Sequence, residues 1–199
     1  MENEFPQLKD KISTNLSPMA TIAKYIKSTD KDAKIVFIGP CTAKKAEFQK
    51  KTVRPYIDSV ITFEELQALL DSREIELASL KEEVLDNASY FGRIFARSGG
   101  LSDAVRQGIK ENGIVGFEYK PIVCDGIEQC KIALLKASKG ISDGNFIEGM
   151  ACVSGCIGGA GCLTHGEKNR RDVDKYGMEA YEKTISDAIG VLPGHKEEK

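Results

Sequence analysis

Two cysteines four residues apart in a glycine-dense segment constrain this chain more than any other feature. They lie in Met150-Ala151-Cys152-Val153-Ser154-Gly155-Cys156, and further glycines follow at positions 158, 159 and 161. Thiolates are soft ligands, and four of them usually hold an iron–sulfur cluster. Glycines let a backbone approach such a cluster closely and turn its N–H groups toward sulfur. The pattern therefore predicts an iron–sulfur site on a loop.

A third cysteine, Cys41, follows the apolar run Ile35–Ile38 and precedes a stretch of helix-forming residues. We expect it at a strand-to-helix corner, where unpaired backbone N–H groups stabilise a thiolate. Lys44, three residues later, lies on the same helical face and can place an ammonium group beside an anionic cluster. The candidate ligands are therefore Cys41, Cys152 and Cys156, one fewer than the four that a cubane requires.

Length and charge exclude several classes of protein. A chain of 199 residues can bury a core as one domain or as two small lobes. Its 28 basic and 30 acidic residues give a net charge of −2 without a basic stripe, which argues against nucleic-acid binding. No apolar run approaches the roughly 18 residues of a membrane span, and the N-terminus carries no apolar signal region. We expect a reduced, cytoplasmic protein, in which loop cysteines are more often ligands or catalysts than disulfides.

Apolar runs and helical periodicity alternate along the chain. The pattern predicts strands at residues 35–38, 57–61, 121–124 and 145–148, and helices at 18–28, 42–51, 62–70, 101–110 and 128–139. Residues 74–87 form either a surface helix or an excursion, and residues 194–199 form a frayed tail. The alternation indicates an α/β fold with a parallel sheet flanked by helices. Ligands of such sheets lie at the carboxyl ends of the strands, where we expect Cys41 and Cys152 to converge.

Other readings compete for the remaining cysteines and histidines. Cys124 ends an apolar strand and Cys130 lies within a helix, so both are expected to be structural. Cys162 lies near the predicted site, but it can equally be a residue that only packs within the loop. His165 and His195 are expected to be exposed histidines with satisfied side chains. Tetrahedral zinc is the main alternative metal, but the glycines and the lack of a Cys-x-x-Cys pair favour iron and sulfide.

Two segments resemble the second and third cluster-binding signatures of the [FeFe]-hydrogenases, the iron-only hydrogenases. They are Pro40-Cys41-Thr42-Ala43-Lys44-Lys45-Ala46-Glu47 and Met150-Ala151-Cys152-Val153-Ser154-Gly155-Cys156. The stretches around Phe5-Pro6, Ser13, Ser17-Pro18 and Phe95–Gly100 resemble intervening segments of that family in the same order. The resemblance thus covers nearly the whole chain. It implies that residues 1–199 are the C-terminal part of the large subunit, within a two-lobed α/β catalytic domain.

The resemblance implies an H-cluster, in which a [4Fe–4S] cubane is joined through a cysteine sulfur to a diiron unit carrying CO, cyanide and an azadithiolate. By motif position, the cubane would be held by Cys41, Cys152 and Cys156, and Cys156 would bridge to the diiron unit. Lys44 would donate a hydrogen bond to a cyanide. Met150 and Phe95 would line the diiron pocket, and Ser13 matches a position on a proton path.

This sequence also departs from the family pattern. The family's first signature, which carries the fourth cubane ligand and a proton-shuttling thiol, is expected just before Met1 and is absent from these 199 residues. Gly39 replaces a methionine, and Ala160-Gly161-Cys162 replaces a glycine–glutamine ending. We therefore expect a divergent C-terminal piece in which the cofactor is absent or incomplete and which is inactive alone. The partners that the resemblance implies are an electron carrier such as ferredoxin, the hydrogenase maturation proteins and the upstream part of the same chain.

Two functional classes remain open. One is a hydrogenase that interconverts protons, electrons and H₂. The other is a non-catalytic hydrogenase-like protein of iron–sulfur cluster assembly, which binds cubanes without a diiron unit. The residues Thr42-Ala43 before Lys44-Lys45 favour the enzyme, because the hydrogenase-like assembly proteins are similar to a different sequence at these positions.

Overall fold

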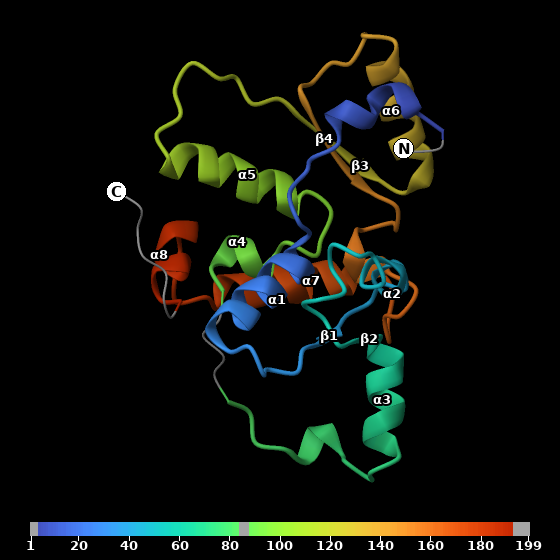
Figure 1. The fold of residues 1–199 in the computed structure, drawn as a ribbon, viewed down its shortest axis with the longest axis vertical. Helices are drawn as coiled ribbons and strands as arrows, with labels where there is room; N and C mark the ends of the chain where they lie inside the picture. The colour runs from blue at the N-terminus through green and yellow to red at the C-terminus, as the bar shows by residue number, and fades with distance from the viewer. Residues whose placement is uncertain (1–3, 84–87, 193–199) are drawn as a thin grey trace. The chain divides into compact units, whose positions relative to one another are not determined.

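The structure is a computed structural model that describes residues 4–83 and 88–192, and its chain divides into two compact units (Figure 1). The larger unit consists of Met1–Ser13, Asp86–Gly158 and Gly166–Lys199. The smaller unit consists of Thr14–Leu85 and Gly159–His165. His195 and the predicted tail at 194–199 lie outside the described residues.

The smaller unit contains a two-stranded parallel sheet with helices beside it. Its elements are α1 (Pro18–Thr29), β1 (Val36–Ile38), α2 (Ala43–Glu47), β2 (Ser59–Ile61), α3 (Phe63–Asp71) and η2 (Leu77–Ser79). Ser17 caps α1, and Pro18 occupies the first helical position, where its missing N–H costs nothing. Thr62 and Glu65 form a reciprocal capping box that begins α3 directly after β2. Strand and helix are therefore joined without a loop.

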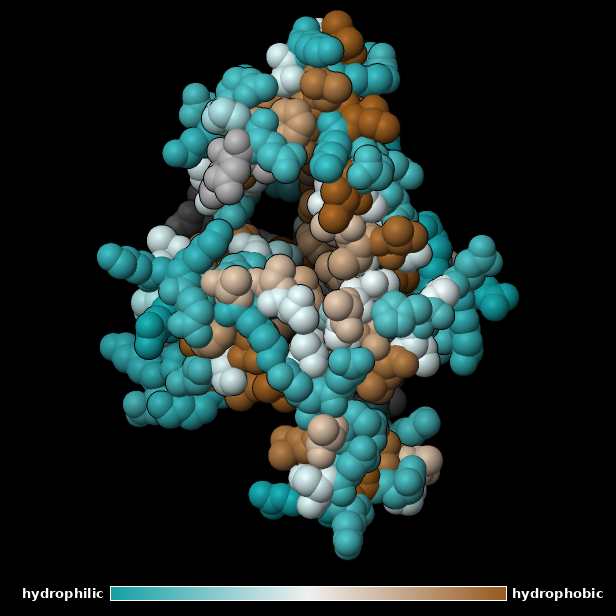
Figure 2. Space-filling model, turned by 90° about the vertical axis from the view of Figure 1, so that its right-hand side faces the viewer, coloured by the Kyte–Doolittle hydropathy of each residue, from teal (hydrophilic) through white to brown (hydrophobic). Residues whose placement is uncertain are grey.

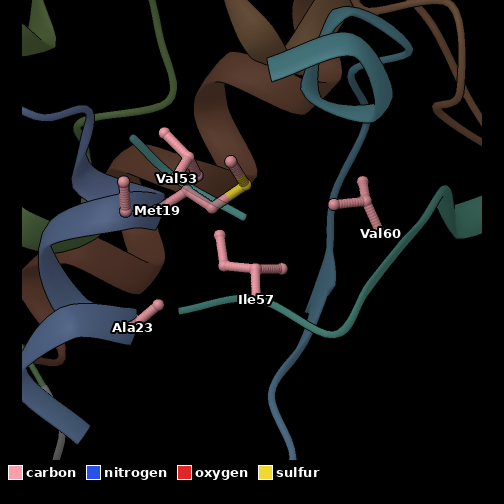
Figure 3. Close-up of a cluster of buried hydrophobic side chains, with 6 residues drawn as sticks. Met19, Ala23, Val53, Ile57 and Val60 are labelled. Atoms are coloured by element: carbon pink, nitrogen blue, oxygen red, sulfur yellow. The ribbon is translucent and has the colours of Figure 1, made fainter. Parts of the chain in front are cut away.

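The core of the smaller unit lies between α1 and the chain that leads into β2. Figure 3 shows Met19 and Ala23 of α1 facing Val53, Ile57 and Val60, all of which are buried. Ala23 and the neighbouring Ala20 are small enough to let the helix approach these side chains closely. This side of the sheet is therefore well packed.

The larger unit contains a second two-stranded parallel sheet and most of the helices. Its elements are η1 (Pro6–Lys11), α4 (Tyr90–Arg93), α5 (Gly100–Glu111), β3 (Pro121–Asp125), α6 (Ile127–Ser138), β4 (Phe146–Met150), η3 (Cys156–Gly158), α7 (Glu167–Met178) and α8 (Ile185–Gly190). β3 and β4 run parallel over five residue pairs, and α6 forms the crossover between them. A crossover helix is the connection that parallel neighbours require.

The α/β class and the parallel pairing predicted from the sequence are confirmed, but the single sheet is wrong. β1 pairs only with β2 and β3 only with β4 among the described residues, so that the strands before Cys41 and Cys152 belong to different sheets. The apolar run at 35–38 would suit a strand buried on both faces, and this expectation is wrong. Val36 and Ile38 are 50% and 41% exposed, whereas Ile35 and Phe37, on the other face, pack against the core.

Several helix bounds also differ from the prediction. The helix after Cys41 ends at Glu47 instead of continuing to Lys51. Residues 74–83 form an excursion whose only regular element is the short η2 (Leu77–Ser79), and residues 84–87 of this stretch lie outside the described residues. Figure 2 shows hydrophobic side chains at the surface among the hydrophilic ones. In the part of the chain that the structure describes, no helix combines the length and the apolar character that crossing a bilayer requires.

A carboxylate on α5 secures the beginning of α8. Glu111 accepts hydrogen bonds from the amides of Ile185 and Ser186, at 2.9 and 2.8 Å, and from the Ser186 hydroxyl. Partial burial raises the pKa of Glu111, but these hydrogen bonds, with one from Gln107, outweigh it and lower the pKa to about 2. The carboxylate form therefore ties α8 to α5.

We expect this tie to weaken in acid. Because the pKa of Glu111 in the folded chain is below the ordinary value of 4.5, its stabilising contribution is full above pH 4.5 and is lost as the pH falls toward 2. The protection factor of the Ser186 amide, which is its intrinsic hydrogen-exchange rate divided by the observed rate, should fall over that range in the native protein. In Glu111→Gln the exchange should already be fast at neutral pH.

Glu128→Gln on α6 is the matched control, because its carboxylate forms no bond to α8. Equal protection of the Ser186 amide in native protein and Glu111→Gln would contradict this account.

Candidate metal centre

The two predicted ligands of the larger unit lie on one tight loop after β4. The Gly155 amide donates to the carbonyl of Cys152 at 3.0 Å and closes a four-residue turn. Ser154, the third residue of this turn, has φ +69°, which a type II turn requires and which is uncommon outside glycine. The following element, η3, begins at Cys156. Both thiols are half-buried.

Glycines are required in this loop for steric reasons. Gly155 has φ +83°, and a Cβ there would lie 2.6 Å from the Ser98 amide nitrogen. A Cβ on Gly158 would lie 2.0 Å from the carbonyl oxygen of Val153. No side chain fits at either position without moving the backbone. These glycines thus set the path of the chain around Cys156 by packing against neighbouring backbone atoms.

The segment Ala96–Ser98 runs beside the cysteine loop and is hydrogen-bonded to it. The Ser98 amide donates to the carbonyl of Ser154 at 3.1 Å, and the Ile157 amide donates to the carbonyl of Ala96 at 3.3 Å. Arg97 and Gly155 form an isolated antiparallel bridge between these two contacts. The loop is thus fixed on both sides of Gly155 by one short segment.

Two side chains hold the cysteine loop at other points. Asp125, which ends β3, accepts a hydrogen bond from the Ser154 amide at 2.7 Å. Asn169 of α7 donates from its side-chain amide to the carbonyl of Ile157 at 3.1 Å. The left-handed conformation of Ser154 is therefore stabilised through both its N–H, by Asp125, and its C=O, by Ser98.

Arg97 is a buried cation with two carboxylate partners. Its Nε donates to Asp174 of α7 at 2.6 Å, and a terminal nitrogen donates to Asp103 of α5 at 3.1 Å. Burial lowers the pKa of Arg97, but the hydrogen bond and charge of Asp174, with Asp103, outweigh it and raise the pKa above its usual value. Arg97 therefore remains charged and ties α5 and α7 to the segment beside the cysteine loop.

Glu148 is a fully buried carboxylate on β4. It accepts hydrogen bonds from the amides of Gly99 and Ser102 at 2.8 and 2.7 Å, at the beginning of α5. The first amides of a helix have no partner inside the helix, and the helix dipole favours negative charge there. Glu148 thus fixes β4 to α5 four residues before Cys152.

Cys124 and Cys130 lie on the α6 side of β4. Cys124 is the register partner of Gly149, and the position of a Cβ on Gly149 would lie 3.5 Å from the Cys130 sulfur. Burial raises the pKa of both thiols. The neighbouring Cys130 raises the pKa of Cys124 further, whereas a hydrogen bond from Cys124 partly offsets the rise in the pKa of Cys130. Protonated, buried thiols are poor ligands, which supports the structural reading of this pair.

Cys41 and Lys44 lie in the smaller unit, at the corner between β1 and α2. Cys41 is half-buried, and its carbonyl accepts from the Lys44 amide at 3.2 Å. The Lys44 ammonium donates to Glu47 within α2, and Glu47 also accepts from the Ser17 hydroxyl. Burial raises the pKa of Glu47, but these two hydrogen bonds lower it overall. The predicted strand-to-helix corner is confirmed, although α2 has only five residues and hence a small dipole.

The remaining predicted site residues are spread over different elements. Met150 ends β4, and its carbonyl accepts from the Gly126 amide at 2.9 Å. Phe95 is half-buried just before the segment Ala96–Ser98, and Ser13 is exposed after η1. The structure therefore brings Met150, Phe95, Cys152 and Cys156 into one unit.

Cys162 lies in the smaller unit and is buried. Its neighbour Gly161 donates to the carbonyl of Pro40 at 3.0 Å, so the segment that carries Cys162 runs beside the Cys41 corner. His165 is exposed, and its Nε2 is 3.1 Å from the carbonyl of Gly159. The expectation of an exposed, satisfied histidine is confirmed for His165.

The donor chemistry fits an iron–sulfur cluster, but neither unit contains a full set of ligands. All six cysteines are free thiols, including Cys41, Cys152 and Cys156. Within residues 4–83 and 88–192, no three Cys, His, Asp or Glu side chains are grouped so that they could hold a metal ion. Of the predicted ligands, Cys152 and Cys156 lie in the larger unit and Cys41 lies in the smaller unit.

Sequence reasoning missed Arg97, Glu148 and Asp125 as supports of the cysteine loop. Arg97 and Glu148 carry a recognisable signal, since each is a single charge among apolar and small residues. Such charges are rarely buried without a partner, so each indicates a specific contact. Which residues supply the partners cannot be read from the pattern, because they are distant in sequence.

Comparison with known proteins identifies the family. Residues 1–160 match the family described as iron only hydrogenase large subunit, C-terminal domain. Iron hydrogenase 1 of Clostridium pasteurianum is 29% identical over 87% of this chain and 37% of the relative. The NADP-reducing hydrogenase subunit HndD of Solidesulfovibrio fructosivorans is 26% identical over 82% of this chain and 35% of the relative. The chain thus spans little more than a third of these relatives.

Solved structures support the same fold. An apo [FeFe]-hydrogenase HydA1 from Chlamydomonas reinhardtii superposes with a TM-score of 0.64 at 19% identity, over 98% of this chain and 69% of that chain. A structure that concerns oxygen inactivation of [FeFe]-hydrogenase gives a TM-score of 0.63 at 21% identity, over 89% and 61%. At these identities the likeness shows the fold, and the match of residues 1–160 shows the family. The chain belongs to the iron-only hydrogenase large subunit family, of which it carries the C-terminal domain.

Proposed function

We propose that the parent protein is an [FeFe]-hydrogenase, an oxidoreductase that interconverts protons, electrons and H₂. We further propose that this chain supplies cubane ligands of its H-cluster, a [4Fe–4S] cubane with a diiron subcluster. The observation that carries the proposal is the cysteine loop. Its two half-buried thiols lie on a turn that protein hydrogen bonds hold from both sides, in a chain of the hydrogenase family.

Each predicted residue has a task that its chemistry supports. Cys41, Cys152 and Cys156 would hold the cubane as thiolates, and Cys156 would also help to hold the diiron subcluster. When bound, the H-cluster supplies the metal centre and the amine at which protons and electrons combine. Lys44 donates a charge-assisted hydrogen bond to an anionic ligand of that centre.

The other residues control access to the centre. Met150 and Phe95 present apolar side chains that exclude water from the diiron pocket. The Ser13 hydroxyl both donates and accepts hydrogen bonds, as passing on a proton requires. We propose a cytoplasmic protein that exchanges electrons with a carrier such as ferredoxin and receives its diiron subcluster from maturation proteins.

The cysteine assignment predicts a contrast between two pairs of thiols. After anaerobic reconstitution of the 199-residue chain with ferrous iron and sulfide, Cys152→Ala and Cys156→Ala should each retain less iron than the native chain. Cys124→Ala and Cys130→Ala should retain as much as the native chain, because desolvation raises the pKa of both thiols and keeps them protonated. Iron and sulfide analysis after gel filtration measures the difference.

Equal iron loss in all four variants would contradict the assignment. Tight binding of zinc with no cubane absorption would replace it with the zinc alternative. A cubane in the full-length protein that never accepts a diiron subcluster would favour the assembly-type relative.

The role of Lys44 predicts a loss of activity in the full-length protein encoded by the parent reading frame. Lys44→Ala should lower the rate of H₂ evolution by about tenfold or more, because a charge-assisted hydrogen bond contributes roughly 1.5–3 kcal/mol. The matched control is Lys45→Ala, since Lys45 pairs with Glu65 rather than with Glu47. A gas assay at equal iron content makes the comparison, and the 199-residue chain alone should give no activity.

Full activity in Lys44→Ala, or an equal loss in Lys45→Ala, would remove Lys44 from the site. Activity in the 199-residue chain alone would contradict the proposal that upstream residues complete the cluster site.

A further inference from the structure

The cysteine loop is supported by a segment of irregular backbone, whose own hydrogen bonds are turns from the Arg97 amide to the carbonyl of Ile94 and from the Gly100 amide to the carbonyl of Arg97. Ala96–Ser98 lies between the four-residue helix α4 and the beginning of α5, outside any helix or ladder. Its backbone nevertheless provides two hydrogen bonds to the loop, at Ser98 and Ala96, with the bridge to Gly155 between them. The geometry of Cys152 and Cys156 therefore depends on what fixes this segment.

The side chain of Arg97 connects this segment to the helices around it. The side chain is only 9% exposed and reaches Asp174 of α7 and Asp103 of α5, while a terminal nitrogen donates to the carbonyl of Ser98. A planar guanidinium with several donors can hold two carboxylates and a carbonyl at once, which an ammonium group cannot do as well. Arg97 thus bonds two helices through its side chain while its backbone lies against the loop.

The carboxylates remain 38% exposed at Asp174 and 44% exposed at Asp103. If the cation is removed, water can solvate them, so that loss of Arg97 does not leave a fully buried charge. A variant at position 97 should therefore fold and lose chiefly the connection between the segment and the helices.

We propose that Arg97 is a positioning residue for the cluster thiols, holding Ala96–Ser98 against the cysteine loop so that Cys152 and Cys156 keep one geometry. The effect of Arg97 on a bound cluster rests on the proposed function. Its effect on the order of the metal-free cysteine loop does not. Arg97 touches no reacting atom, and it acts through the backbone of its own segment.

The first experiment measures thiol reactivity in the metal-free 199-residue chain. Alkylation of Cys152 and Cys156 by iodoacetamide, followed by peptide mass spectrometry, should be about tenfold faster in Arg97→Met than in the native chain, because the loop opens more often. Asp174→Asn should accelerate it less, since Asp103 remains. Arg97→Lys, which keeps the charge, should restore part of the protection.

The matched control is Arg93→Met. Arg93 also ties its segment to α7, through the carbonyl of Tyr176 at 3.2 Å and the face of that ring, but its backbone amide donates to the carbonyl of Ser89 rather than to the cysteine loop. Alkylation of Cys152 and Cys156 should be unchanged in Arg93→Met. Equal acceleration in Arg93→Met and Arg97→Met, or no acceleration in Arg97→Met, would overturn the proposal.

The second experiment reads the cluster itself. After anaerobic reconstitution with ferrous iron and sulfide, the electron paramagnetic resonance spectrum of the dithionite-reduced cluster should be broadened or shifted in Arg97→Met and unchanged in Arg93→Met. An unchanged spectrum in Arg97→Met would overturn the positioning role. Failure of the full-length protein encoded by the parent reading frame to bind any cluster would instead overturn the proposed function, and with it the part of this inference that concerns the cluster.

Discussion

The contact between Glu148 and the first turn of α5 is the interaction on which the larger unit depends. Burying a carboxylate costs several kcal/mol unless its oxygens are hydrogen-bonded, and here the Gly99 and Ser102 amides bond one oxygen each. These amides would otherwise lack partners, so one contact satisfies both needs. Because successive side chains of a strand alternate, Glu148 faces α5 while Gly149 faces the Cys130 sulfur of α6. Strand β4 is thereby fixed between two helices before the chain turns toward Cys152.

Arg97 complements this arrangement with the opposite charge. Glu148 fixes the chain as it enters the cysteine loop, and Arg97 fixes the segment that lies beside the loop. Both use α5, one at its first amides and the other at Asp103. The cysteine loop is therefore connected to α5 through two oppositely charged side chains.

The elements around the site were predictable wherever a local rule decides them. The caps at Ser17 and Thr62, the parallel pairing of β3 with β4 and the tight loop at Gly155 all follow from residues close in sequence. The division into two sheets was not predictable, because strand order depends on contacts between distant segments. The early end of α2 and the exposure of Val36 likewise reflect packing that no local pattern records.

The construction of the cysteine loop has a consequence for the order of events in biogenesis. Its shape is set by protein atoms: the turn closed at Gly155, the left-handed Ser154 held by Asp125 and Ser98, and Gly158 packed against the Val153 carbonyl. The conformational entropy of ordering this loop is therefore spent when the polypeptide folds. Under the proposed function, metal insertion would then meet a loop whose turn is already formed, and the binding energy of iron and sulfide would go into affinity instead of into shaping the chain.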